Sequence, residues 1–571
     1  MTTKTSSKNT LGTGNNGEVN QAGRDINQAI NYYSLSEFEK SLKRKLAYLH
    51  QQIKTAEISQ QKNELQTQIV ETSYWLSDPE AAYNDFLAQR EKLLARLAKL
   101  ENVDDERLEQ AKQALEDGNL QQADQLFEAI SEDQRHLQSV QILAESEYAR
   151  GVIAATEIRW HDAAEHYERA SQLEPSVEYL LQASSFLNKV AQYLKAEMLA
   201  RQALELAIVQ HGEEHPDTAT SYNNVAGNLN PQGKYTEAEP LYRKALDIRG
   251  RVLGENHPDT ASSYNNIAYN LNAQGKYAEA ELLFRKALEI YKRVLGEEHP
   301  DTANSDNNVA SNLNAQGKYT EAEPLYRKAL DILRRILGEE HPDTASSYNN
   351  LAYNLNAQGR YAEAEPLLRK ALDIRQRVLG KEHPDTAASY NNVAANLDDQ
   401  GKHTEAELLY RKALDIREFV LGEDHPSTAT SYNNLASNLN AQGRYAEAEP
   451  LLLKALEIYK RVLGEEHPNT ATSYNNLASN LDDQGKYAEA KPLYRKALDI
   501  RGRVSGKEHP STAASYNNVA GNLYAQGKYA EAVPLAKRAV DIAVKTLGAE
   551  HPNTKIFQGT YDGIRANLTE Q

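Results

Sequence analysis

Length, composition and charge exclude several classes of protein. The 571 residues include 64 Lys and Arg against 81 Asp and Glu, a formal net charge of −17, which argues against binding to nucleic acid or to an anionic membrane. The absence of cysteine rules out disulfides, thiolate metal ligands and a cysteine nucleophile. The sequence contains neither a secretory signal nor a run of about 20 apolar residues, so we expect a cytoplasmic protein.

Residues 1–34 are polar, rich in Gly, Asn and Thr, and without a helical period, so we expect a disordered N-terminal segment. Within it, the string GEVNQAGRDINQAI from Gly17 to Ile30 alternates Val19 and Ile26 with polar residues. It is similar to short N-terminal tags found on bacterial signalling and defence proteins. Two alternatives are open for this string: an assembly tag, or no role at all.

Residues 35–101 are predicted to form helices. Ser36 and Glu39 have the spacing of a capping box, and apolar residues follow at heptad-like steps. Asp78 and Pro79 then begin a second helix. An antiparallel helical hairpin and a self-associating coiled coil both fit this pattern, and the coiled coil would make a homo-oligomer through 35–101.

A fixed repeat dominates the rest of the chain. The dipeptide His-Pro recurs every 42 residues from His215 to His551 and marks eight whole units in 213–550, while about three divergent copies precede them in 102–212. Such a period predicts a solenoid in which each unit buries its apolar stripe against its neighbours. The more polar segment 551–571 aligns with the start of a ninth unit, and we expect it to form a capping helix.

Each unit divides into two predicted helices, A and B. In the fourth unit, Pro342 suits the first turn of helix A, and apolar or small residues recur at three- and four-residue steps through Leu355. Gly359 is expected to end this helix in the left-handed conformation. Helix B should start after Tyr361, with Pro366 near the end of its first turn.

The string NNLAYNLNAQGRYAEAEPLLRKALDI over these two helices resembles the tetratricopeptide repeat, and the 42-residue period resembles the kinesin-light-chain type of that family. The resemblance extends from about Gly212 to Thr554. It implies an all-α fold, a right-handed superhelical solenoid of helix pairs. It also implies a protein-binding role, with groove asparagines that hold a bound peptide. The near-identical repeats and the N-terminal string lead us to expect a bacterial source.

The nine His-Pro histidines are the obvious metal candidates. Stacking would hold neighbouring histidines about 20 Å apart, too far to share a zinc ion with ligands at about 2.1 Å, so we expect them to pack the turns instead. No phosphate-binding loop, HExxH or GxSxG motif occurs. The sequence therefore predicts a non-catalytic protein that uses no cofactor and no metal.

Pairs of adjacent asparagines recur in the middle of every helix A, where asparagine costs roughly 0.5 kcal/mol relative to alanine. Two interpretations compete: hydrogen bonds between repeats, or amides that line a concave groove and bind the backbone of an extended peptide. The candidate residues are Asn223, Asn224, Asn265, Asn266, Asn307, Asn308, Asn349, Asn350, Asn391, Asn392, Asn433, Asn434, Asn475, Asn476, Asn517 and Asn518.

One variable position, which follows each Leu/Val/Ile-Ala dipeptide, is expected on the same concave face. It holds Tyr269 and Tyr353, which are candidate aromatic anchors for a ligand. The eight A helices contain no Lys or Arg, but they do contain the carboxylates Asp398, Asp399, Asp482 and Asp483. We therefore expect a protein or peptide ligand that is neutral or basic rather than acidic.

The predicted function is a non-catalytic scaffold or adaptor that binds an extended peptide or a partner surface on the concave face of the superhelix. The alternative is a regulatory or sensor subunit of a bacterial signalling or defence assembly, in which the N-terminal region mediates oligomerisation. Neither nucleic acid nor a membrane is expected among its partners.

Overall fold

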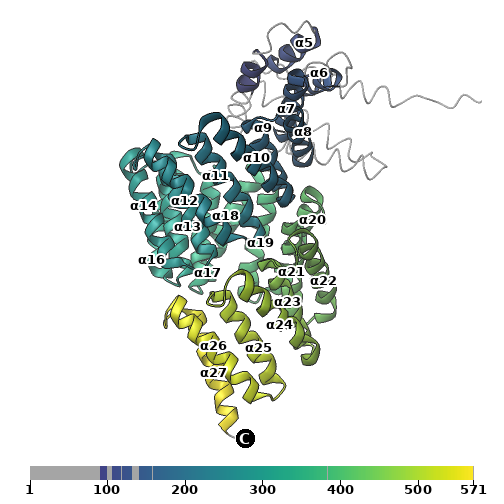
Figure 1. Cartoon of the computed structure of the whole chain (residues 1–571). Coiled ribbons are helices and arrows are strands. Elements are labelled where there is room, and N and C mark those ends of the chain that lie inside the picture. The colour runs from purple at the N-terminus through teal and green to yellow at the C-terminus, as the bar shows by residue number, and fades with distance from the viewer. Residues whose placement is uncertain are drawn as a thin grey trace, which may run out of the picture. The chain divides into compact units, whose positions relative to one another are not determined.

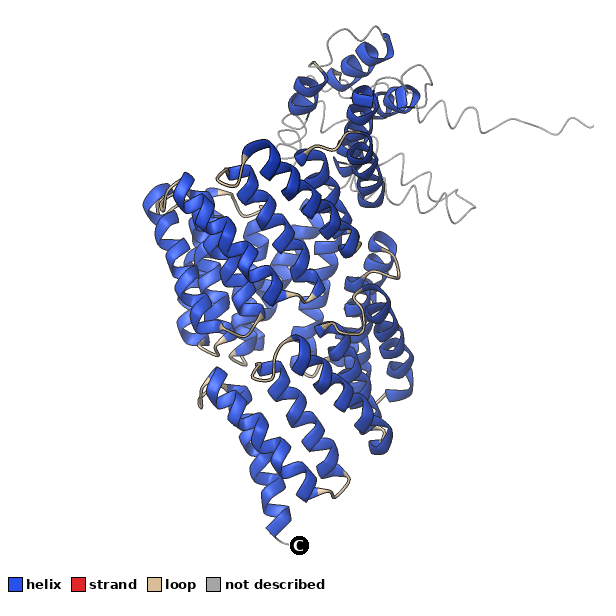
Figure 2. Ribbon diagram, in the orientation of Figure 1, coloured by secondary structure: helices blue, strands red, loops and turns tan. Residues whose placement is uncertain are grey.

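The computed structural model describes residues 90–98, 106–117, 119–131, 140–156, 159–381 and 383–569. The predicted N-terminal segment and nearly all of the predicted hairpin or coiled coil lie outside these residues. The chain divides into two compact units, 1–159 and 160–571, and each is described by itself. All regular secondary structure in the described residues is helical (Figure 2), which confirms the predicted fold class.

The first unit holds helices α5 (Glu106–Glu116), α6 (Leu120–Ser131) and α7 (Val140–Thr156). Helix α5 packs on α6, and α6 packs on α7. Buried apolar side chains that include Phe127 and Ile130 fill the space between them. These helices lie in the stretch that the sequence assigns to divergent repeats.

The second unit opens with α8 (Trp160–Leu173), α9 (Val177–Lys189) and α10 (Tyr193–His211). Eight helix pairs follow (Figure 1). The A helices are α11 (Pro216–Leu229), α13 (Pro258–Ala273), α15 (Pro300–Ala315), α17 (Pro342–Ala357), α19 (Pro384–Asp399), α21 (Pro426–Ala441), α23 (Pro468–Asp483) and α25 (Pro510–Ala525). The B helices are α12 (Tyr235–Val252), α14 (Tyr277–Leu295), α16 (Tyr319–Ile336), α18 (Tyr361–Val378), α20 (His403–Leu421), α22 (Tyr445–Val462), α24 (Tyr487–Val504) and α26 (Tyr529–Leu547). A short 3₁₀ turn, η2 (Asn230–Gln232), follows α11, and α27 (Pro552–Thr569) packs on α26 at the end of the stack.

A histidine caps the N-terminus of every A helix. In α17, Nδ1 of His341 accepts a hydrogen bond from the backbone N–H of Asp343 at 3.1 Å, and Pro342 occupies the first helical position, where its missing N–H costs nothing. All nine His-Pro histidines make this bond. The sequence analysis expected turn packing and missed this role, because histidine is not among the residues that commonly cap helices.

Glycine ends each A helix as predicted. Gly359 adopts φ +74°, and the N–H of Arg360 reaches back to the carbonyl oxygen of Leu355 at 2.9 Å, which closes the helix end. Helix α18 then starts at Tyr361 itself. Pro366 is consequently its sixth residue, beyond the first turn in which the sequence analysis placed it.

Helices pack in chain order: A on B within a repeat, and B on the next A. Alanines such as Ala352, Ala364 and Ala371 are fully buried, and their small side chains let the helix axes approach closely. Successive A helices also touch one another directly, for example α15 with α17 and α21 with α23. The A helices therefore line the inner, more tightly curved side of the solenoid, which we call the inner face.

The superhelix winds back onto itself. Four contacts, each between residues 236 positions apart, join His425 to Lys189, His467 to Pro231, His509 to Ala273 and His551 to Ala315. In each, Nε2 of the histidine faces a backbone carbonyl oxygen, at 2.9 Å for His467 and 3.3 Å for His509. Since Nδ1 accepts the capping bond, Nε2 carries the proton and donates it. One turn of the superhelix thus contains between five and six repeats. Its His-Pro segments pack on the loops that join helices A and B in the preceding superhelical turn.

Candidate functional site

The structure brings asparagine pairs of neighbouring repeats together. The second asparagine of one repeat donates to the first asparagine of the repeat before it in three places: Asn266 to Asn223 at 2.7 Å, Asn434 to Asn391 at 2.8 Å and Asn518 to Asn475 at 2.7 Å. These bonds are the ones that the inter-repeat interpretation requires.

Other asparagine pairs lack this hydrogen bond between repeats. The side-chain oxygens of Asn265, Asn307, Asn349, Asn433 and Asn517 are buried without a hydrogen-bond partner. A buried amide left in this state costs about 1–3 kcal/mol. The second asparagines, for example Asn308 and Asn350, stay partly exposed on the inner face. Inter-repeat bonding therefore accounts for only some of the pairs, and the second members remain within reach of a ligand.

A third asparagine forms the continuous link between repeats, and the sequence analysis missed it. In α17, Nδ2 of the fully buried Asn354 donates to Asn314 Oδ1 at 2.7 Å and to the carbonyl oxygen of Tyr319 at 2.8 Å. The same two bonds recur from Asn270, Asn312, Asn396, Asn438, Asn480 and Asn522. The available signal was an asparagine inside the apolar stripe of helix A, between Ala352 and Leu355, where a buried polar group requires partners.

Tyr269 and Tyr353 are the large exposed side chains at the variable position of the inner face, with 48 % and 66 % of their surface accessible. The Tyr269 hydroxyl donates to Asn308 Oδ1, and its ring meets Phe284 of helix B edge-on, with ring centres 5.1 Å apart. In other repeats helix B supplies a buried tyrosine opposite a small residue, as Tyr326 does opposite Ser311. Burial raises the pKa of Tyr326. Tyr269 and Tyr353 are thus the positions where an aromatic side chain is left open to a ligand.

Two of the four carboxylates of the A helices form hydrogen bonds between repeats. Asp398 and Asp482 replace the acceptor asparagine of the inter-repeat link and accept from Asn438 and Asn522 at 2.6 Å. These two carboxylates therefore take part in the link between repeats, and the expected preference for a neutral or basic ligand stays a prediction. Asp399 and Asp483 lie at the C-terminal ends of their helices, where burial raises the pKa of each.

A basic side chain follows each A–B glycine of the eight repeats. Lys276, for example, lies 3.2 Å from Glu239 of the preceding helix B, which also accepts from Gln274 at 2.8 Å. Burial alone would raise the pKa of Glu239, but hydrogen bonds from Gln274, Arg243 and Lys276 lower it to about 2. These bases form ion pairs with glutamates along the edge of the solenoid, and the eight A helices contribute no Lys or Arg to the inner face.

Among the residues that the structure describes, one His-Pro histidine, His215, belongs to a group that could hold a metal ion. His211, His215 and Asp217 place three possible ligand atoms within 4.8 Å of one another, but Nδ1 of His215 already accepts the N–H of Asp217 at 3.2 Å. We therefore assign no metal to this group.

At the contacts between superhelical turns, burial lowers the pKa of His425 and of His467 to about 4.

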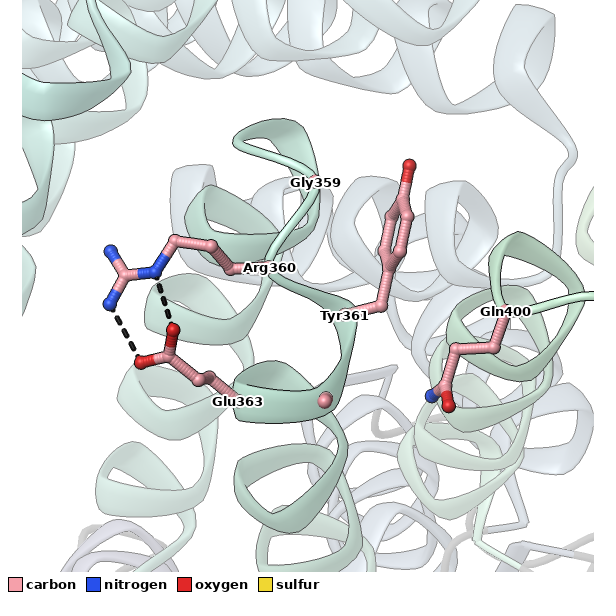
Figure 3. A pocket seen from close by; sticks show the side chains of 6 residues that line it. Gly359, Arg360, Tyr361, Glu363 and Gln400 are labelled. Atoms are coloured by element: carbon pink, nitrogen blue, oxygen red, sulfur yellow. Dashed lines mark hydrogen bonds and ion pairs between the residues drawn. The ribbon is translucent and has the colours of Figure 1, made fainter.

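A shallow pocket of about 370 Å³ lies beside the A–B turn of the fourth repeat. Gly359, Arg360, Tyr361 and Glu363 line one side, and Gln400 of the next repeat lines the other (Figure 3). Arg360 and Glu363 close one wall with an ion pair at 2.7 Å. The pocket lies on the edge of the solenoid at the end of helix A.

Comparison with protein families identifies the repeats. The tetratricopeptide-repeat model matches 177–249, 222–293, 264–310, 301–356, 344–418, 400–460, 427–503, 477–545 and 511–556, a continuous stretch of well over half the chain. The chain belongs to the tetratricopeptide-repeat family. This confirms the family that the sequence analysis inferred from the repeat. No curated protein matches the chain.

Several solved structures are similar to parts of this tetratricopeptide-repeat protein. The repeats of a putative kinesin light chain from Podosopora anserina are 30% identical, cover 36% of this chain and 98% of their own, and have a TM-score of 0.32. BtubC (BKLC) from P. vanneervenii is 24% identical over 40% of this chain and 92% of its own, with a TM-score of 0.35. The apo form of RapI is 20% identical over 48% of this chain and 98% of its own, with a TM-score of 0.38. None of the helices in the described part of the chain has the length and apolar content needed to cross a membrane.

Proposed function

We propose that this tetratricopeptide-repeat protein is a non-catalytic scaffold that binds an extended peptide or partner surface along the inner face. The observation that carries the proposal is the exposure of Tyr269 and Tyr353 on a face otherwise made of amides and small residues. Exposed aromatic rings of this kind are the side chains that most often anchor protein interfaces. The proposal keeps the cytoplasmic location that the sequence leads us to expect.

The asparagine pairs suit the backbone of such a ligand. The amides of Asn308 and Asn350 are partly exposed on α15 and α17. Each offers N–H donors, while Asn308 Oδ1 already accepts from the Tyr269 hydroxyl. Tyr353 follows Asn350 by three residues, so both side chains point to the same side of the helix. One repeat thereby combines an aromatic anchor with an amide that can bind a peptide group.

The charge of the inner face favours a neutral or basic ligand. The A helices contribute no Lys or Arg to it, and the bases of the A–B turns are paired with glutamates of the preceding helix B. An acidic peptide would therefore lose its hydration without gaining a cationic partner.

A binding experiment with a matched control tests this function. Fluorescent peptide pools of neutral, basic and acidic composition would be titrated with the wild type, with Asn350→Ala/Tyr353→Ala, and with Leu408→Ala. Leu408 is 63 % exposed on α20, a B helix, and serves as the control for loss of an exposed side chain outside the A helices. We expect the double variant to bind neutral and basic peptides at least about tenfold more weakly, equivalent to about 1.4 kcal/mol, with an unchanged melting temperature.

The proposal fails if the double variant folds normally and binds as the wild type does, or if both variants lose binding equally. The alternative function, a sensor subunit that oligomerises through its N-terminal region, depends on residues outside the described structure and stays a prediction. Co-purification with an NTPase or nuclease from the source organism would favour it.

A further inference from the structure

The A–B turns form one edge of the solenoid, and the structure places them in two environments. A Cβ added to Gly275 would lie 2.8 Å from Pro510 Cδ, and one added to Gly317 would lie 2.8 Å from His551 Cδ2, because the next superhelical turn rests there. Added to the equivalent Gly359, Gly401, Gly443, Gly485 and Gly527, it would meet nothing within 4 Å. We call these five turns the open edge.

The turn at Gly359 is the uncovered form of a turn that is covered elsewhere. At Gly233 and Gly275 the corresponding position receives a proline ring together with a histidine whose Nε2 donates to the carbonyl oxygen two residues before the glycine. At Gly359 the corresponding space is open, and the pocket of about 370 Å³ lies beside the same turn. The open edge is therefore complementary in shape to a His-Pro turn.

The opposite edge of the solenoid offers such turns. The side chains of His215, His257 and His299 are 39 %, 40 % and 41 % exposed, whereas His467, docked on the previous turn, is only 4 % exposed. All three hold the same capping bond through Nδ1. They present to solvent the same His-Pro geometry that His467 and His509 use inside the molecule.

Charge distinguishes the docked turns from the exposed ones. The residue after His-Pro is neutral in the four docked turns, where it is Ser427, Asn469, Ser511 and Asn553. It is aspartate in the exposed turns, at Asp217, Asp259 and Asp301. A base follows the glycine at open and covered turns alike, as Arg360 and Lys276 show, and both bases are paired with a glutamate of the preceding helix B.

The difference between docked and exposed turns has a physical reason if the exposed turns dock between molecules. A contact within one chain forms at a high effective concentration and needs no charge to guide it. A contact between two chains lacks that advantage, and the aspartates of the exposed turns would act on it by competing with Glu323 and Glu365 for Arg360 and Lys402.

We propose that the open edge binds the exposed His-Pro turns of a second copy of this chain, head to tail. The contact would continue the one that already joins successive superhelical turns, with the same histidine, proline and carbonyl partners. Because the two surfaces are different, the contact is heterologous, and repetition of it extends the superhelix into a filament rather than closing a dimer.

Sedimentation velocity of the full chain over a range of concentrations tests the proposal. The His-Pro variant His215→Asn/His257→Asn/His299→Asn keeps the helix caps, since asparagine caps well, but it loses the Nε2 donor. The open-edge variant Gly359→Ala/Gly401→Ala/Gly443→Ala places methyl groups where a docking proline ring would have to lie, as Pro510 does beside Gly275. We expect the wild type to form larger species as concentration rises, less so at high salt, and each variant alone to stay monomeric.

Mixing the two variants gives the sharpest outcome. Each variant retains one intact edge, so an equimolar mixture should form dimers and nothing longer. A wild type that stays monomeric at every concentration overturns the proposal, as does a variant that still associates like the wild type through another surface, including 35–101. Failure of two folded variants to form the mixed dimer also overturns it.

Two further measurements separate folding and charge from docking. If the open-edge glycine variant loses helicity, a second variant replaces it. Arg360→Ala/Lys402→Ala/Arg444→Ala removes the bases that follow these glycines without placing a side chain at a left-handed position, and we expect it to weaken association in the same assay. Asp217→Asn/Asp259→Asn/Asp301→Asn should also weaken association. Stronger association in this variant would mean that the carboxylates keep copies apart, and the proposal would be wrong.

Discussion

The covered A–B turns of the first repeats and the open turns of the later repeats have nearly the same sequence but different surroundings. Gly275 and Gly359 follow the same Asn-Ala-Gln string and share φ values of +73° and +74°. One is in contact with a His-Pro turn from the next superhelical turn, and the other faces an empty pocket. The comparison teaches that in a solenoid the position along the superhelix, rather than the local sequence, decides which copy of a surface is used.

We expect the largest effect from a change of pH, because it weakens all four histidine contacts between superhelical turns at once. Protonation of Nδ1 would break the helix cap, and burial disfavours the charged ring, so the pKa of His425 and of His467 falls to about 4. The Arg417 and His161 charges that face His425 add to the lowering, while the carbonyl oxygen of Lys189 opposes it.

Because these pKa values are lower in the docked state than the ordinary value near 6.5, the contact is at full strength above about pH 6.5 and weakens as pH falls toward 4. For the buried His467 the loss approaches about 3 kcal/mol at the acid limit. Small-angle scattering should show the radius of gyration increasing between about pH 7 and about pH 5 while helical circular dichroism is kept. The variant with asparagine at His425, His467, His509 and His551 is the control, and it should be extended at both pH values. An unchanged radius in the wild type would contradict the closed superhelix.

A matched pair of glycine substitutions sharpens the comparison with a smaller effect. Gly275→Ala and Gly359→Ala share the left-handed strain, about 1 kcal/mol each. Only the first places a methyl group 2.8 Å from Pro510 Cδ, which adds about 1–3 kcal/mol of overpacking. Thermal melts of the two variants should therefore differ, with Gly275→Ala the less stable. Equal melting temperatures would show that the covered turn is not in contact in solution.

The smallest effect contrasts two asparagines of one helix. Asn354→Ala removes the fully buried link to Asn314 and Tyr319 and should lower stability by about 1–3 kcal/mol. Asn350→Ala, at a partly exposed position, should change it by less than about 0.5 kcal/mol. Urea denaturation of both variants measures the difference. If Asn350→Ala destabilises the protein as much as Asn354→Ala does, the pairs are structural and the proposed peptide contact loses its support.

Much of the fold could be read from the repeat itself. The period of 42 residues, the proline at the start of helix A and the glycine at its end predicted helix boundaries close to those observed for α17. The candidate site was predicted less completely. The pairs were correctly placed on helix A, but the asparagine that joins all repeats was overlooked, because its burial depends on packing against the next helix pair. The role of Asp398 in the same link was hidden for the same reason.

The sequence by itself determined the helix pairs, their stacking order and the absence of cationic residues from the A helices, since these follow from local periodicity and composition. Only the tertiary structure decided which turns are covered and which are open. That outcome depends on the small rotation between successive repeats, which accumulates over between five and six units until His467 meets Pro231. A rotation of this kind is set by side-chain packing at every junction, and no single repeat contains it.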